Sequence, residues 1–172
     1  MREPVNAERV LRFMRAVAAD VHRPHRVYFT GGVTAVLLGW RSSTIDIDLK
    51  IEPEEDDLLR AIPEIKERLA LNVELASPDH FIPQLEGWRN RCLPIATEGS
   101  VSFSHYDLYS QALAKIERGH RQDLEDVREM LGRGLVERDR LKDFFQSIEA
   151  SLYRYPAIDP QKFREAVRQA TE

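Results

Sequence analysis

The spacing of hydrophobic residues predicts strands and helices in alternation up to about residue 105 and helices alone beyond it. An amphipathic helix is expected over residues 6–20, with Asn6 as its N-cap. A β-rich run, Arg26–Thr30, ends at Gly31-Gly32 and passes directly into a second helical stripe. The two helical stripes consist of Val10, Leu11, Met14 and Val17, and of Val33, Val36, Leu37 and Trp40.

The next segment, Thr44–Lys50, alternates with period two. Its apolar residues Ile45, Ile47 and Leu49 share one face, and Asp46 and Asp48 share the other, which predicts a strand with an acidic face. The remaining pattern predicts a helix over 54–70, a short strand over 72–76 centred on Glu74, an irregular stretch to Arg91, a hairpin of 93–97 with 101–104, and helices over 107–118, 122–131, 137–154 and 160–170.

These elements predict an α/β (α+β) protein. Residues 1–105 would form a core with a short mixed sheet flanked by helices, and residues 106–172 a C-terminal helical bundle packed on it as a single compact unit. A length of 172 residues with 42% hydrophobic and 31% charged residues is typical of one globular domain.

Several classes of protein are excluded by what the chain lacks. Cys92 has no second cysteine to pair with, no apolar run approaches the ~18 residues of a membrane span, and the first residues lack a signal peptide's apolar region. We therefore expect a cytoplasmic protein without a membrane partner. The five histidines show no zinc-binding spacing, and neither a Gly-x-Ser-x-Gly nor a Walker motif occurs.

The basic residues are unevenly chosen, and this bears on possible partners. The formal net charge is −4, and twenty of the 25 basic residues are arginine. This composition argues against a generally basic surface that coats nucleic acid, while local arginine clusters can still bind phosphates.

The strongest chemical feature is the order Gly31-Gly32, helix, Asp46-x-Asp48. Adjacent glycines at a strand-to-helix junction let backbone N–H groups approach a triphosphate, whose negative charge a helix N-terminus favours. Two carboxylates at i and i+2 of a strand point the same way, about 6–7 Å apart at Cα, and can bind divalent metals. Ser43 and Thr44, which lead into the acidic strand, can also reach phosphate.

These residues resemble the signature of the DNA polymerase beta-type nucleotidyltransferases, a glycine-rich helix start followed by Asp-x-Asp and a third acid on a later strand. Gly31-Gly32 and Asp46-x-Asp48 match it directly, and Glu74 is the best candidate for the third acid, although Asp is more usual there. The resemblance implies that Asp46, Asp48 and Glu74 bind Mg²⁺ or Mn²⁺ and that Gly31 and Gly32 hold the phosphates of an NTP.

A second resemblance lies in the segment from Lys115 to Asp126. It is similar to the Lys-plus-Arg/Asp segment of the abortive-infection type of bacterial nucleotidyltransferase, a group that includes toxins of toxin–antitoxin pairs. The resemblance implies that Lys115 contacts the triphosphate, that Arg118 and Arg121 hold phosphates or acceptor, and that Asp123 or Asp126 lies at the edge of the site. The sequence does not decide between these two aspartates.

The predicted function is transfer of NMP from an NTP such as ATP to an acceptor hydroxyl on RNA such as tRNA, or on protein, with a toxin role and a cognate antitoxin as partner. The alternatives are a small-molecule nucleotidyltransferase of the antibiotic-modifying kind, a non-catalytic binding or regulatory module of the same fold, and a structural adaptor.

Each site residue also has a purely structural interpretation. Asp-x-Asp occurs on solvated sheet faces, and Glu74 on a solvated edge would look the same in the sequence. Lys115 fits the boundary of a buried helix face. Asp123 fits the first turn of a helix, and Asp126 is suitably placed to pair with nearby arginines.

Overall fold

The computed structural model describes residues 2–172, with residue 56 described by its backbone alone. The chain forms two compact units. The first unit contains the chain up to Ser77 together with Cys92–Tyr106, and the second unit contains Pro78–Arg91 together with Asp107–Glu172. The α+β class, with a mixed sheet, flanking helices and C-terminal helices, is confirmed.

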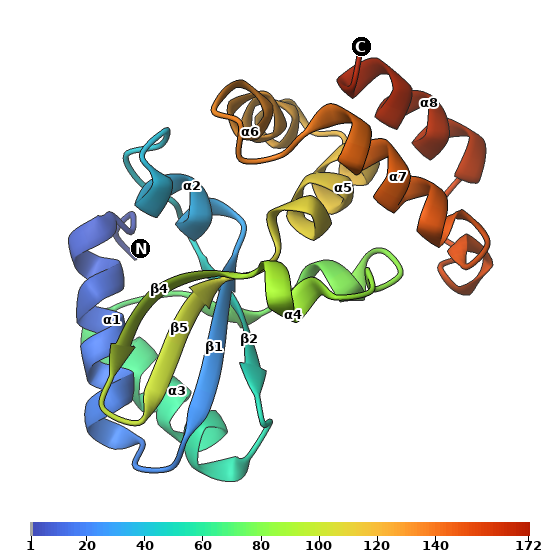
Figure 1. Cartoon of the computed structure of the whole chain (residues 1–172). Helices are drawn as coiled ribbons and strands as arrows, with labels where there is room; N and C mark the ends of the chain where they lie inside the picture. The colour runs from blue at the N-terminus through green and yellow to red at the C-terminus, as the bar shows by residue number, and fades with distance from the viewer. Residues whose placement is uncertain (1) are drawn as a thin grey trace. The chain divides into compact units, whose positions relative to one another are not determined.

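The first unit is built on one five-stranded sheet with the order β3-β2-β1-β5-β4 (Figure 1). Strand β1 pairs antiparallel with β2 and parallel with β5, and β2 pairs parallel with β3. Strands β4 and β5 form the predicted antiparallel hairpin. The strands are β1 His25–Thr30, β2 Ile47–Glu52, β3 Val73–Leu75, β4 Leu93–Glu98 and β5 Val101–His105.

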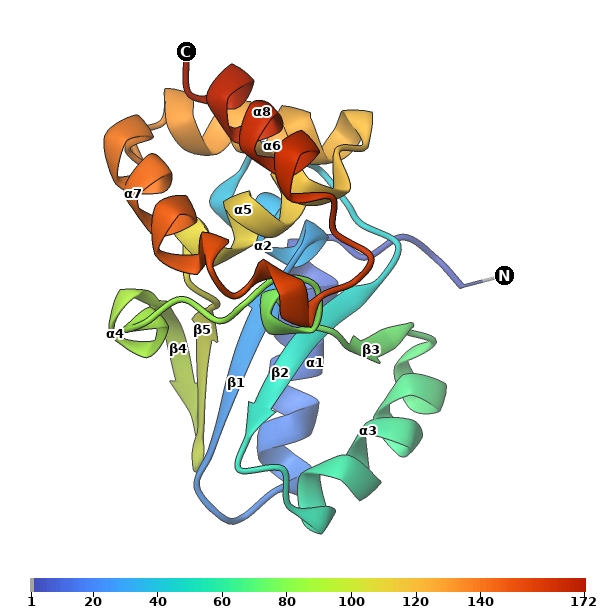
Figure 2. The ribbon, with the colours of Figure 1, turned by 90° about the vertical axis from the view of Figure 1, so that its right-hand side faces the viewer.

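Two long helices, α1 (Ala7–Asp20) and α3 (Asp56–Leu69), pack against each other on one face of this sheet (Figure 2). Asn6 caps α1 as predicted, because its side chain accepts a hydrogen bond from the Arg9 amide. The apolar faces of both helices and of the central strands form one buried cluster. The opposite face of β1 and β2 is therefore left to carry the polar side chains of the alternating pattern.

The second unit consists of helices and 3₁₀ turns. They are η1 Pro78–His80, α4 Trp88–Arg91, α5 Leu108–Arg118, α6 Arg121–Gly132, α7 Arg138–Glu149, η2 Leu152–Arg154 and α8 Pro160–Ala170. The segment before α5 is tied to it by Arg91, whose guanidinium donates to both carboxylate oxygens of Asp107 at 3.1 and 2.9 Å. Asp107 also caps α5 by accepting from two of its first amides.

Three predicted elements differ in their bounds, and the segment predicted to be irregular contains the short elements η1 and α4. Strand β2 begins at Ile47 rather than Thr44, so Ile45 does not join the buried face and is 75% exposed. Helix α2 (Gly32–Leu38) ends before Trp40 because Gly39 adopts a left-handed conformation, with φ at 97°. The single helix expected over 137–154 stops at Glu149 and is followed by η2.

None of the helices in the described part of the chain has the length and apolarity that a bilayer requires.

Candidate functional site

The polar face of the sheet brings Asp48 and Glu74 together. In the parallel pair of β2 and β3, Asp48 lies directly opposite Glu74, and in the antiparallel pair of β1 and β2, Thr30 lies opposite Asp48. Because residues in register share a face of the sheet, these three side chains project to the same side. The two carboxylates predicted from separate segments are thus neighbours.

Asp46 joins them through Asn72, a residue that the sequence analysis did not single out. Asp46 lies one position before β2, and Asn72 lies one position before β3. The Ile47 amide donates to the Asn72 carbonyl at 2.8 Å. The Asn72 side-chain amide donates to Asp46 Oδ1 and also to Glu74 Oε1, the latter at 3.4 Å. Asn72 precedes Glu74 by two residues, so the period-two pattern contained the signal that would have found it.

Gly31 is required at the start of α2. It is the N-cap residue, with φ 63° and ψ −136°, a conformation in which a side chain is strained. A Cβ added there would lie 2.9 Å from Asp48 Oδ2. The Asp48 carboxylate therefore lies directly against the backbone at the helix start, where a bound phosphate is also favoured.

Gly32 is enclosed by the segment that leads into β2. A Cβ at this position would overlap Thr44 Oγ1, and it would lie 2.6 Å from Thr44 Cβ and 2.9 Å from an Arg41 guanidinium nitrogen. Thr44 is held there by two backbone hydrogen bonds with Val5. Of the two predicted phosphate contacts from this segment, Thr44 thus lies against the glycine pair, and Ser43 is half-buried next to it.

The donor set of Asp46, Asp48 and Glu74 suits a hard divalent cation, because Mg²⁺ and Mn²⁺ prefer carboxylate oxygens. Within the described residues, Asp46 and Glu74 both accept from the neutral Asn72 amide, and neither takes part in an ion pair. Among the described residues, the three metal-ligand side chains whose ligand atoms all lie within 4.8 Å of one another are His25, Glu55 and Asp57. They are not Asp46, Asp48 and Glu74.

The other predicted site residues lie in the second unit, where Lys115, Asp123 and Asp126 form a buried ionic network that the partly exposed Arg118 joins. The Lys115 ammonium donates to Asp126 Oδ2 at 2.8 Å and lies 3.7 Å from Asp123 Oδ1. Arg118 binds both oxygens of Asp123, at 2.8 and 2.5 Å. Both Asp123 and Asp126 thus contact Lys115, so their local geometry does not decide which of the two lies at the edge of the predicted site. Arg121 is 94% exposed and lies 3.3 Å from Glu125 in an i,i+4 pair.

The electrostatics of this network favour the ionised form of Asp123. Burial by itself would raise the pKa of this carboxyl, but the hydrogen bond and charge of Arg118, assisted by Lys115 and His120, hold its pKa below the ordinary value.

The comparisons with known proteins agree with the motif at the acidic edge. Residues 8–170 match the model of a family described as "Nucleotidyltransferase of unknown function (DUF6036)". No curated protein and no solved structure gives a significant match to the chain. Because the family model covers nearly the whole chain, the protein belongs to this nucleotidyltransferase family.

Proposed function

We propose that the protein transfers NMP from an NTP, such as ATP, to an acceptor hydroxyl and releases pyrophosphate in a reaction that depends on Mg²⁺ or Mn²⁺. The observation that supports this most is the register of Asp48 opposite Glu74, with Asp46 linked to Glu74 through Asn72. Three carboxylates beside a glycine-lined helix start are what nucleotidyl transfer requires.

In this proposal the acceptor oxygen attacks the α-phosphorus, a new O–P bond forms, and the bond to the β-phosphate oxygen breaks. Glu74, which is exposed at the strand edge, accepts the hydroxyl proton. The amides of Gly31 and Gly32 bind the β- and γ-phosphates, with Thr44 beside them. Asp46, Asp48 and Glu74 would hold the metal, which when bound polarises the phosphates and neutralises the charge of the leaving pyrophosphate.

The experiment is calorimetric titration of each of the four NTPs, with Mg²⁺, into wild type and an Asp46→Asn/Asp48→Asn variant, followed by a pyrophosphate-release assay. We expect Mg²⁺-dependent binding of at least one NTP, and at least a ~100-fold loss of pyrophosphate release in the variant.

The matched control is Asp139→Asn/Asp143→Asn, which removes the same charge from exposed positions of α7. It should behave as wild type. If folded wild type binds no NTP, or if the Asp46/Asp48 variant releases pyrophosphate at the wild-type rate, the proposal is wrong and a non-catalytic member of the family is indicated.

The acceptor and the biological role form a finer part of the proposal. We infer a macromolecular acceptor, RNA such as tRNA or a protein, and a toxin controlled by a cognate antitoxin in a cytoplasmic setting. This part rests on the resemblance of the segment from Lys115 to Asp126, as do the predicted phosphate or acceptor contacts of Lys115, Arg118, Arg121 and Asp123. Transfer of α-³²P-labelled NMP to tRNA or protein would support it, and transfer only to small hydroxylated compounds would overturn it.

A further inference from the structure

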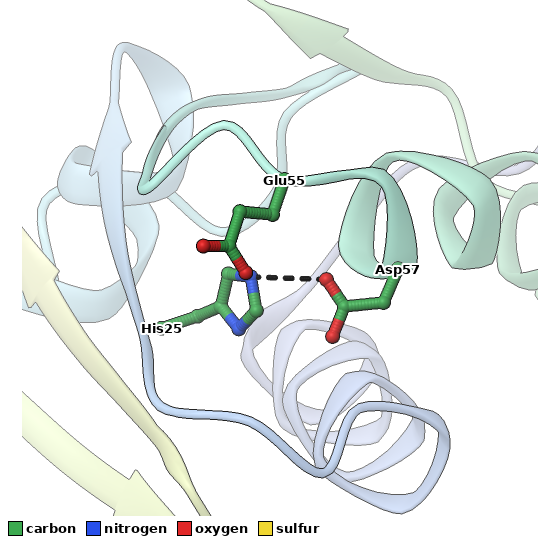
Figure 3. Close-up of side chains that lie close together, drawn as sticks. All are labelled: His25, Glu55 and Asp57. Atoms are coloured by element: carbon green, nitrogen blue, oxygen red, sulfur yellow. Dashed lines mark ion pairs between the residues drawn. The ribbon is translucent and has the colours of Figure 1, made fainter.

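A second group of ligand-type side chains lies in the first unit, where the start of β1 meets the start of α3. His25 is the first residue of β1, Glu55 is the N-cap of α3, and Asp57 lies in its first turn. One ligand atom from each lies within 4.8 Å of the other two (Figure 3). His25 Nε2 is 3.2 Å from Asp57 Oδ1.

The buried His25 distinguishes this group from a simple cluster of acidic residues. Its side chain is fully buried, and its Nε2, which lies at ion-pair distance from Asp57 Oδ1, makes no hydrogen bond. Its Nδ1 lies 2.9 Å from the backbone carbonyl oxygen of Arg23. A ring N–H donated to a carbonyl leaves the lone pair of the other nitrogen available, which is how metal-binding histidines are usually oriented.

The donor set identifies the class of ion. An imidazole nitrogen with two carboxylates suits a divalent transition metal of the zinc class, whereas Mg²⁺ and Ca²⁺ prefer oxygen ligands alone. The side chains of Glu55 and Asp57 are 47% and 34% exposed, so water can complete the coordination. Both carboxylates line a surface pocket of about 550 Å³, which Arg23 and Arg60 also line.

We propose that His25, Glu55 and Asp57 bind one divalent metal ion of the zinc class, at a site distinct from the proposed nucleotide site. His25 begins β1 and Gly31 follows its last residue, so the strand separates the two sites by about 20 Å along its length. The ion joins the start of the strand to the start of α3. It therefore stabilises the first unit, and the inference does not depend on the proposed function.

The test uses the full chain without a histidine tag, stripped with EDTA and dialysed. We expect calorimetric titration of Zn²⁺ alone to show binding of one ion per chain, and Zn²⁺ to raise the Tm. Glu55→Gln and Asp57→Asn should each weaken this binding at least ten-fold and reduce the gain in Tm. His25→Gln should do the same, and the two carboxylate variants carry the test if it does not fold.

The matched control is His22→Gln, which changes an exposed histidine three residues earlier and should leave Zn²⁺ binding unchanged. Co²⁺ provides a direct readout, because its visible absorption depends on its ligands and should change in all three ligand variants. Absence of Zn²⁺ binding, or binding that the ligand variants leave intact, overturns the proposal. The Asp46→Asn/Asp48→Asn variant should retain the Zn²⁺ site, which separates failure here from failure of the proposed function.

Discussion

The two units treat buried titratable groups in opposite ways. In the first unit, burial lowers the pKa of His105 to about 4, and its Nδ1 lies 3.0 Å from the hydroxyl of Thr34, so the ring is neutral at pH 7. In the second unit, burial by itself would raise the pKa of Asp123, but the hydrogen bond and charge of Arg118, with the charge of Lys115, hold this pKa low and keep the carboxyl ionised. The first unit keeps the buried His105 ring uncharged, whereas the second unit pairs the buried Asp123 carboxylate with cations.

The same difference separates the two sets of predicted site residues. Asp46 and Glu74 share one neutral amide donor, Asn72, so their negative charge is available to a cation from outside the protein. The ammonium of Lys115 is already balanced by Asp126 and Asp123. Two carboxylates held by one shared amide indicate a ligand site more strongly than a charge network that is complete in itself.

The largest expected effect is on the network of the second unit. Lys115→Met should lower the free energy of unfolding by about 3–5 kcal/mol, because it leaves Asp126 and Asp123 without the ammonium that they contact in a buried setting. Urea unfolding measures this, and Lys115→Met/Asp126→Asn should recover part of the loss. Lys142→Met, at a partly exposed position of α7, should cost less than about 0.5 kcal/mol. An unchanged stability with weakened NTP binding would instead assign Lys115 to the substrate.

Acid should reveal the different treatment of charge in the two units. Unfolded histidine takes up a proton below about pH 6.5, whereas folded His105 does so only near pH 4, so the stability of the first unit should fall by up to about 3 kcal/mol between these values. Asp123 has a lowered pKa, so its contribution persists above about pH 4 and is lost only below it. Hydrogen exchange at pH 7, 5.5 and 4.5 should show the first unit opening before the second. His105→Asn should flatten this pH dependence, and an unaltered profile would contradict the assignment.

Gly32→Ala tests the close approach of Thr44 to the start of α2. The added Cβ overlaps the threonine side chain, so we expect a loss of about 1–3 kcal/mol in the free energy of unfolding, together with weaker NTP binding. Gly132→Ala is the matched control, since it adds the same methyl group where nothing lies within 4 Å. Equal stability of the two variants would show that the glycine is not enclosed.

The smallest change in stability is expected at Asn72. Asn72→Ala should cost no more than about 1 kcal/mol, because its hydrogen bonds are only partly buried, yet it should lower pyrophosphate release by about ten-fold by freeing Asp46 and Glu74. Asn90→Ala, at an exposed asparagine of α4, should leave both quantities unchanged. Wild-type activity in Asn72→Ala would mean that Asp46 and Glu74 keep their positions without the Asn72 amide.

Local patterns were sufficient for most elements of the fold. The spacing of apolar residues predicted α1, α8 and the hairpin of β4 and β5 almost to the residue, because caps, glycine turns and alternation act over a few positions. Predictions failed where another part of the chain decides. Ile45 alternates correctly with Ile47, but the backbone there pairs with Val5 through Thr44 and enters the sheet only at Ile47.

The sequence by itself determined the α+β class, the glycine-lined helix start and the strand that carries Asp48, since each depends on residue type and short-range spacing, although Asp46 lies one residue before that strand. Only the tertiary structure decided that β3 lies parallel to β2 with Glu74 opposite Asp48, that Asn72 links Asp46 to Glu74, and that His25 faces Glu55 and Asp57. Strand pairing joins residues more than twenty positions apart, and its register follows from packing the whole buried face, which no local pattern contains.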